Sequence, residues 1–189
     1  MSLSQFRSIG HDLFVRGLVS SHSGNLSIRL GDRLIITRRG SRLSCINEND
    51  LIETGVDKND RSTPLASKEL VVHRAIYQAT TALAIVHAHP PHTIALSLTK
   101  TEIVPSGVED FSVVGQVPVL GSYGEVDVEG LAEVIAQALT KCHIVVVRGH
   151  GSFAIGQLLD EAYNYTTVLE ESSQVNCLLR SLQNDSSGD

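Results

Sequence analysis

A stretch of 25 residues without Asp, Glu, Lys or Arg, residues 75–99, is the feature of this sequence that most constrains its fold. The stretch is long enough to cross a bilayer, but it contains three histidines and the pair Pro90-Pro91, which suit a transmembrane helix poorly. We therefore expect it to lie inside a globular domain. It divides into the end of one helix, a short apolar strand, and a second helix that Pro90-Pro91 opens, since proline is tolerated in a first turn.

Helical and strand-like patterns alternate along the rest of the chain. Apolar residues at helical spacing predict helices, and alternating or short buried runs predict strands. The expected helices are residues 4–19, 67–78, 127–139 and 160–182. The expected strands are residues 25–29, 33–37, 50–54, 83–88, 113–120 and 143–147, of which the first two form a hairpin around Gly31-Asp32. This mixture predicts one layered α/β or α+β domain, residues 1–182, followed by a polar tail, residues 183–189.

The composition argues against several classes of protein. With 42% hydrophobic and 19% charged residues, the chain has the composition of an ordinary globular domain. A net charge of -6 opposes non-specific binding to nucleic acid, which needs a basic face. Three scattered cysteines, Cys45, Cys142 and Cys177, form no C-x-x-C pair, so no disulfide framework or thiolate zinc site is expected. The N-terminus resembles no signal peptide, and we expect a soluble, cytoplasmic protein without a membrane partner.

Two histidines end the apolar strand predicted within the uncharged stretch. Residues i and i+2 of a strand point to the same face, about 6.6 Å apart, so His87 and His89 can converge on one metal ion. Imidazole is a good ligand for zinc. His150 follows another buried strand and lies between two glycines, so it is a third candidate. From the residues alone, His92 is either a further ligand or a surface residue, and each histidine has a structural interpretation as well.

Glu69 is expected in the first turn of the helix predicted at residues 67–78. Acidic residues are common in first turns because the helix dipole favours them there. The functional alternative is a general acid and base beside a metal ion. His73 lies four residues later on the same helix face, and we expect it to be structural.

A dinucleotide site is the main rival interpretation. Residues 149–154 fit G-x-G-x-x-G/A, and Glu170 follows about 20 residues later. A single helix is predicted after this run, so no second parallel strand completes the βαβ unit that such a site requires. The sequence also contains no G-x-S-x-G motif, which is the usual signature of a serine hydrolase.

The motifs occur together in the order of a known family. The runs are residues 23–27 (SGNLS), Ser67-x-Glu69, His87-x-His89 and Gly149-His150-Gly151. They resemble the class II aldolase/adducin family, most of all its L-fuculose-1-phosphate aldolase members, over nearly the whole chain to about Val175. The resemblance implies a three-layer α/β/α sandwich around a mixed, mainly antiparallel sheet. It also implies a homotetramer with active sites at subunit interfaces.

The resemblance further implies roles for individual residues. His87, His89 and His150 would hold one zinc ion or another divalent metal, and Glu69 would be the catalytic proton donor and acceptor. The substrate phosphate would be bound by the residues that align with the family's phosphate site, namely Gly24, Asn25, Arg39, Gly40, Ser67 and Lys68. The implied reaction is the reversible cleavage of a ketose 1-phosphate, similar to L-fuculose 1-phosphate, into dihydroxyacetone phosphate and a short aldehyde.

Two departures from the family pattern leave the substrate open. Arg39 and Lys68 replace small hydroxyl residues and Arg38 replaces a proline. The extra charge indicates a more strongly held phosphate or another anion such as a carboxylate, and the alternative for Arg38 is a solvated surface side chain. The family's tyrosine from a neighbouring subunit has no counterpart, and Glu109 or Asp110 stands in that stretch. The alternatives are a pentulose-5-phosphate 4-epimerase, a sugar-phosphate dehydratase and a non-catalytic adducin-like interaction module. A scaffold has no need for the intact set of three histidines and a glutamate.

Overall fold

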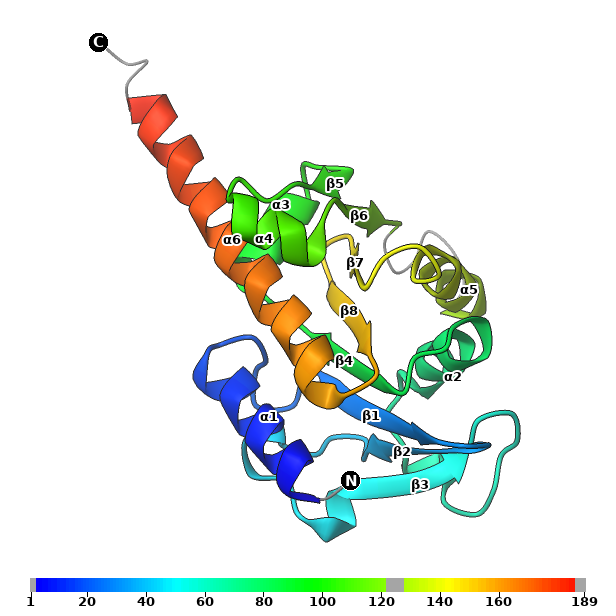
Figure 1. Ribbon diagram of the computed structural model, residues 1–189. Helices are drawn as coiled ribbons and strands as arrows, with labels where there is room; N and C mark the ends of the chain where they lie inside the picture. The colour runs from blue at the N-terminus through cyan, green and yellow to red at the C-terminus, as the bar shows by residue number, and fades with distance from the viewer. Residues whose placement is uncertain (1–2, 122–127, 186–189) are drawn as a thin grey trace.

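The computed structural model describes residues 3–121 and 128–185. A sheet of eight strands runs through the middle of this part of the chain, in the order β3-β2-β1-β4-β8-β7-β6-β5 (Figure 1). The strands are β1 (Asn25–Leu30), β2 (Arg33–Thr37), β3 (Leu51–Gly55), β4 (Ala84–Ala88), β5 (Glu102–Ile103), β6 (Val117–Leu120), β7 (Ile144–Val147) and β8 (Gly151–Gly156). Neighbouring strands are antiparallel, except that β6 and β7 are parallel.

Helices cover both faces of the sheet (Figure 1). One face carries α1 (Leu3–Val15), α3 (Pro91–Ser97), α4 (Val108–Val114) and α6 (Leu159–Asp185). The other face carries α2 (Leu70–Ala79) and α5 (Val128–Ala138). The structure thereby confirms the expected α/β/α sandwich around a mixed, mainly antiparallel sheet. Within the described ranges, no helix combines the length and the hydrophobicity needed to cross a bilayer.

The central strand β4 is buried on both faces, which explains why it lies in an uncharged stretch of sequence. Ala84, Val86 and Ala88 pack toward α1 and α6, whereas Ile85 packs toward α2 and α5. Because side chains alternate along a strand, His87 shares the face of Ile85. The end of β4 therefore presents an imidazole on the α2 side of the sheet.

Some local predictions differ from the structure. The strand predicted at residues 113–120 is the end of α4 followed by β6, because two acidic residues after Gly107 favour a helix start and Gly115, with φ of 61°, ends that helix. β8 and the short β5 were not predicted. β8 lacks alternation because it is buried along almost its whole length. Residues 149–154, considered above as a dinucleotide loop, form the β7–β8 turn and most of β8.

Several helix boundaries also differ. The first helix ends at Val15 rather than near residue 17 or 19, and α2 begins at Leu70, so that Glu69 is its N-cap residue. α6 continues to Asp185, so the first residues of the predicted polar tail are helical. Asp127, the predicted start of α5, and residues 186–189 lie outside the described residues.

Candidate functional site

The candidate site is a cavity of about 460 Å³ at the C-terminal end of the central strand β4. Its lining is contributed by five segments of the chain. The lining residues are His22, Ser23, Gly24, Asn25, Arg38, Arg39, Gly40, Ser41, Ser67, Lys68, Glu69, His87, His89 and His150. Every residue to which the family resemblance gave a role in metal binding, catalysis or phosphate binding borders this one cavity.

Three imidazoles converge at the inner end of the cavity. His87 Nε2 lies 3.1 Å from His89 Nε2 and 3.2 Å from His150 Nε2. One ligand nitrogen from each of the three lies within 4.8 Å of the others. The antiparallel pairing of β4 with β8, in which Ala88 lies opposite Ser152, brings the β7–β8 turn and its histidine beside the end of β4.

The surroundings of His87 fix the orientation and the tautomer of its ring. Its Nδ1 lies 2.9 Å from the Ser152 carbonyl oxygen. Because a carbonyl only accepts, Nδ1 carries the proton and Nε2 offers a lone pair to the cavity. Phe153 stacks on the ring with centroids 4.1 Å apart and planes 15° from parallel. Such a hydrogen bond behind the ligand atom is typical of metal-binding histidines.

The imidazoles suit a divalent metal. Burial lowers the pKa of His87 well below 6.5 and lowers the pKa of His89 to about 4, although the charge of Glu69 opposes both shifts. These two rings are therefore neutral at pH 7, the state in which imidazole binds a metal. Nitrogens bound tetrahedrally to zinc at 2.0–2.1 Å lie about 3.3 Å from one another. The two shorter separations in the triad are close to this value, so the residues fit the metal that the family resemblance implies.

The turn that presents His150 is held in place by its backbone. Gly149 has φ of 68°, a conformation that favours glycine, and its N–H donates to Ser97 Oγ over 2.9 Å. A Cβ atom at Gly151 would overlap the Ala88 carbonyl oxygen. Glycine is therefore required on both sides of His150, on one side for conformation and on the other for close packing against β4.

Glu69 lies beside the triad. Its Oε1 is 3.6 Å from His150 Nε2, and its side chain is 18% exposed. The N–H of Glu69 donates to Ser67 Oγ over 3.3 Å. A carboxylate at this place can exchange a proton with a molecule in the cavity.

His73 does not border the cavity. It is fully buried, and its Nδ1 lies 2.6 Å from Ser27 Oγ, which in turn lies 2.7 Å from the Tyr77 hydroxyl. Burial lowers the pKa of His73 to about 4, so the ring is neutral at pH 7. The hydrogen bonds join α2 to β1, which is the structural role expected from the sequence.

The cavity is also lined, next to the imidazoles, by residues that can bind an anion. One of them, Asn25, lies opposite His87 in the pairing of β1 with β4. Gly24 and Gly40 have φ of 77° and 73°. Asn25 is 4% exposed, and its Oδ1 has no hydrogen-bond partner among the described residues. The exposed side chains of Arg39 and Lys68 supply positive charge at the rim. The Asn25 NH₂ group and the two cations are donors that can bind an oxyanion, whereas Asn25 Oδ1 is an acceptor that a donor group of a ligand would satisfy.

One detail of the expected anion site needs correction. The sequence analysis placed Ser67 at a helix start, where free backbone N–H groups bind anions. In the structure the Ser67 N–H donates to the Thr37 carbonyl over 3.1 Å, and the helix begins at Leu70. Ser67 therefore offers only its hydroxyl, which already accepts the hydrogen bond from Glu69.

Other residues considered earlier lie elsewhere. His92 does not border the cavity, and both its N–H and its Nδ1 donate to Glu170 Oε1, over 3.0 and 2.8 Å. Glu109 and Asp110 lie in the first turn of α4, away from the cavity of their own chain. The sequence analysis missed His22 and Ser41. Their positions next to Gly24 and Gly40, whose motifs were recognised, are the signal that could have identified them.

Over nearly its whole length, the chain is similar in sequence and structure to enzymes named for phosphorylated substrates. The family described as "Class II Aldolase and Adducin N-terminal domain" matches residues 4–177. An L-fuculose phosphate aldolase of Methanococcus maripaludis is 32% identical over 187 residues, covering 97% of this chain and all of the relative. A 3-oxo-tetronate 4-phosphate decarboxylase of Escherichia coli is 28% identical over 174 residues, covering 88% of this chain and 82% of the relative. The crystal structure of an L-fuculose-1-phosphate aldolase from Thermus thermophilus superposes with a TM-score of 0.89 at 36% identity, with 96% of each chain covered.

Proposed function

Because the chain belongs to the class II aldolase and adducin family, we propose that it is a metal-dependent aldolase of a ketose 1-phosphate. The reaction releases dihydroxyacetone phosphate and a short aldehyde, reversibly. The observation that carries this proposal is the convergence of three imidazoles beside Glu69, in a cavity that three cations border. The full-length similarity to proteins named L-fuculose phosphate aldolase supports it.

In this proposal His87, His89 and His150 hold one divalent ion, for which zinc is the best match. The bound ion supplies Lewis-acid stabilisation of negative charge on a substrate oxygen. As the carbon–carbon bond of the ketose breaks, Glu69 accepts the proton of the hydroxyl that becomes the aldehyde oxygen. It then returns a proton to the carbon that remains in dihydroxyacetone phosphate. Phe153 and the Ser152 carbonyl keep the His87 ring from turning.

The phosphate would lie among the cavity residues next to the triad. The Asn25 amide, the backbone at Gly24 and Gly40, and the Ser67 hydroxyl surround it, while Arg39 or Lys68 adds a charge-assisted contact. Binding the phosphate there holds the reacting carbons next to both Glu69 and the triad. This positioning lowers the barrier by fixing the reacting groups in one geometry.

A second candidate function is decarboxylation of a phosphorylated 3-oxo acid. Three cations, Arg38, Arg39 and Lys68, border the cavity, which is more positive charge than one phosphate needs. A substrate with both a phosphate and a carboxylate would match this surplus. The relative from Escherichia coli, named for the decarboxylation of such a compound, supports the candidate.

We further propose that the protein is cytoplasmic and a homotetramer, with a mass in light scattering near four times 20.4 kDa.

Metal content and turnover test the proposal. The purified protein, reconstituted with zinc, should contain about one ion per chain, since three-histidine sites with a fourth open position bind zinc firmly. It should condense dihydroxyacetone phosphate with lactaldehyde, glycolaldehyde or acetaldehyde. Glu69→Gln should retain the metal and lose about 10²–10⁴-fold in turnover. Carbon dioxide release from a phosphorylated 3-oxo acid, or epimerisation of ribulose 5-phosphate, without any condensation would refute the aldolase assignment.

The anion-binding residues have their own test. Lys68→Ala should lower the affinity for phosphorylated substrates by about tenfold, the value of one charge-assisted contact. The affinity for an unphosphorylated analogue should not change. Arg61→Ala is the matched control, because Arg61 is an exposed cation that does not border the cavity. Equal loss for both classes of ligand would show that Lys68 does not bind the phosphate.

A further inference from the structure

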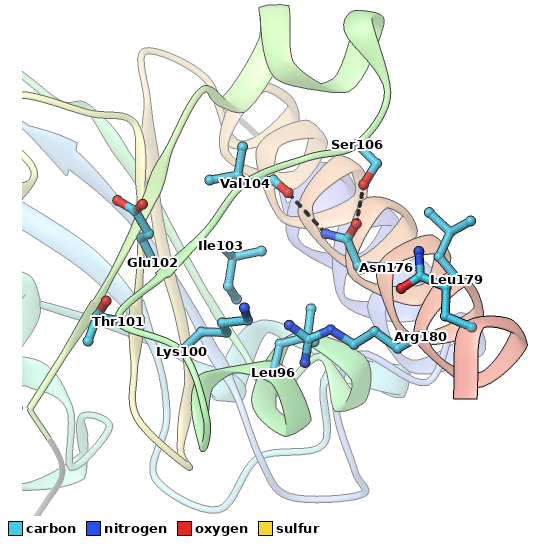
Figure 2. A pocket seen from close by; sticks show the side chains of 11 residues that line it. Leu96, Lys100, Thr101, Glu102, Ile103, Val104, Ser106, Asn176, Leu179 and Arg180 are labelled. Carbon is cyan, nitrogen blue, oxygen red and sulfur yellow. Dashed lines mark hydrogen bonds between the residues drawn. The ribbon is translucent and has the colours of Figure 1, made fainter. Parts of the chain in front are cut away.

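A second hollow of the molecule, of about 440 Å³, lies between the end of α3 and the outer part of α6. We call it the α3–α6 hollow. It is lined by Leu96, Lys100, Thr101, Glu102, Ile103, Val104, Ser106, Asn176, Leu179, Arg180 and Gln183 (Figure 2). None of these residues borders the candidate active-site cavity. The volume is within the range of sites for small molecules.

Two positive charges converge in this hollow. Figure 2 shows the Lys100 ammonium, which follows α3, and the Arg180 guanidinium, which comes from α6, turned toward one another. Neither forms an ion pair with a carboxylate within the described part of the chain. Two like charges repel when they face the same space, so an anion that binds between them would stabilise the arrangement.

The acidic side chain that borders the hollow does not neutralise this pair. The Glu102 carboxylate is turned away from Lys100 and Arg180 in Figure 2. It accepts a hydrogen bond from Gln116 Nε2 over 3.4 Å. The chain as a whole carries a net charge of -6, so an uncompensated cation pair is a local exception.

The walls of the hollow are fixed by hydrogen bonds and by buried apolar side chains. Asn176 on α6 accepts from the Ser106 hydroxyl and donates from Nδ2 to the Val104 carbonyl over 3.0 Å, which ties the segment after β5 to α6. Leu96 and Ile103, which are 5% and 2% exposed, form the floor. The two cations therefore project from elements held at a constant separation.

We propose that the α3–α6 hollow is a second ligand site, which binds the phosphate group of a small organic phosphate between Lys100 and Arg180. A phosphate monoester carries a charge of about -1.5 to -2 at pH 7, which matches two cations. The guanidinium binds two of its oxygens and the ammonium binds a third as a point charge. The organic part of the ligand then contacts the apolar floor.

Inorganic phosphate is the probe that tests the proposal, with the Ile103 methyl resonance of the full-length protein as the reporter. The Ile103 signal should shift saturably as phosphate replaces chloride at constant ionic strength. The methyl of Ile135, on α5 beyond the sheet, should not shift. Lys100→Gln and Arg180→Gln should each weaken the apparent affinity by about fivefold, the value of one solvent-exposed charge contact. Both residues are exposed, so the variants should fold normally.

Arg61→Gln is the control for the general loss of a positive charge, and it should leave the Ile103 titration unchanged. Three results would overturn the proposal. The first is an Ile103 signal that does not saturate with phosphate. The second is a titration of both Lys100→Gln and Arg180→Gln that equals that of the wild type. The third is a shift of Ile103 with protein concentration in the absence of phosphate that Lys100→Gln and Arg180→Gln both abolish, which would mean that an acidic segment of a second copy fills the hollow.

Discussion

Glu170→Gln should destabilise the protein strongly, although Glu170 does not border the candidate site. The residue lies on α6 and is only 7% exposed. Its Oε1 accepts from the His92 N–H and Nδ1, and its Oε2 accepts from the Thr93 N–H and Oγ1, over 2.8–3.0 Å. The carboxylate thus satisfies the first free N–H groups of α3 from another part of the chain, as a capping residue does.

The size of the expected loss in stability follows from the hydrogen bonds that a glutamine amide can and cannot make in place of the carboxylate. The carbonyl oxygen of glutamine still accepts two of the four hydrogen bonds, but its NH₂ group faces two donors at the other position. A hydrogen bond to a charged group contributes about 1.5–3 kcal/mol, and a buried donor left unpaired costs a similar amount. Since the Thr93 hydroxyl can turn toward the Ser173 hydroxyl, 3.0 Å away, part of the loss is recovered. We therefore expect a loss of about 2–4 kcal/mol in the free energy of unfolding.

Urea unfolding followed by circular dichroism measures this loss, and the next residue is a matched control. Glu171 pairs with Arg16, but the two side chains are 60% and 51% exposed. Such an exposed pair contributes well under about 1 kcal/mol, so Glu171→Gln should barely move the unfolding midpoint. If Glu170→Gln unfolds within about 0.5 kcal/mol of Glu171→Gln, the carboxylate is not a cap that α3 requires.

Three further perturbations have defined outcomes. Hydrogen bonds from Ser62, and then from Arg33, hold the pKa of Asp60 below its usual 3.8, so its contribution to stability is present above that pH and is lost as the pH falls below it. Unfolding midpoints of Asp60→Asn should accordingly fall less on acidification than those of the wild type. Gly151→Ala should cost about 2–4 kcal/mol, because its Cβ would overlap the Ala88 carbonyl, and calorimetry together with zinc analysis should show lower stability and lower metal content. Tyr77→Phe should cost about 1–2 kcal/mol in urea unfolding by removing a fully buried hydrogen bond to Ser27, and no change would mean that this bond contributes nothing.

The sequence predicted elements where one local signal was enough. The Gly31-Asp32 turn between two alternating segments predicted the β1–β2 hairpin, and the uncharged stretch predicted β4 between two helices. The sequence did not predict β8, because a strand that is buried on both faces and bounded by glycines shows no alternation of apolar and polar residues. It also failed at α4, where the β-branched residues of 113–120 outweighed the Gly107 helix-start signal.

In the candidate site, too, the features with a local sequence signal were predicted and those that depend on the fold were not. The i, i+2 spacing of His87 and His89 was visible in the sequence, although β4 ends at Ala88 and the second histidine lies just beyond it. The proximity of His150 depends on the β4–β8 pairing, which joins positions more than 60 residues apart, and no local pattern reports such pairing. Only the family resemblance connected the three. The Ser67–Thr37 backbone hydrogen bond, which removes one expected phosphate donor, was equally invisible before the fold was known.

Packing constrains the residues that pass the end of β4 far more than it constrains Arg39 and Lys68. A Cβ at Gly24 would lie 2.9 Å from the His87 carbonyl oxygen, and one at Gly151 would overlap that of Ala88, so both neighbours of β4 require glycine where they pass its end. These glycines are needed to seat the His87-x-His89 segment, whatever the substrate is. Arg39 and Lys68 are exposed and satisfy no packing requirement of the fold. The same scaffold can therefore change the charged side chains at the rim of the cavity without disturbing the triad, which is why the motifs of this chain indicate a possible metal site more closely than a substrate.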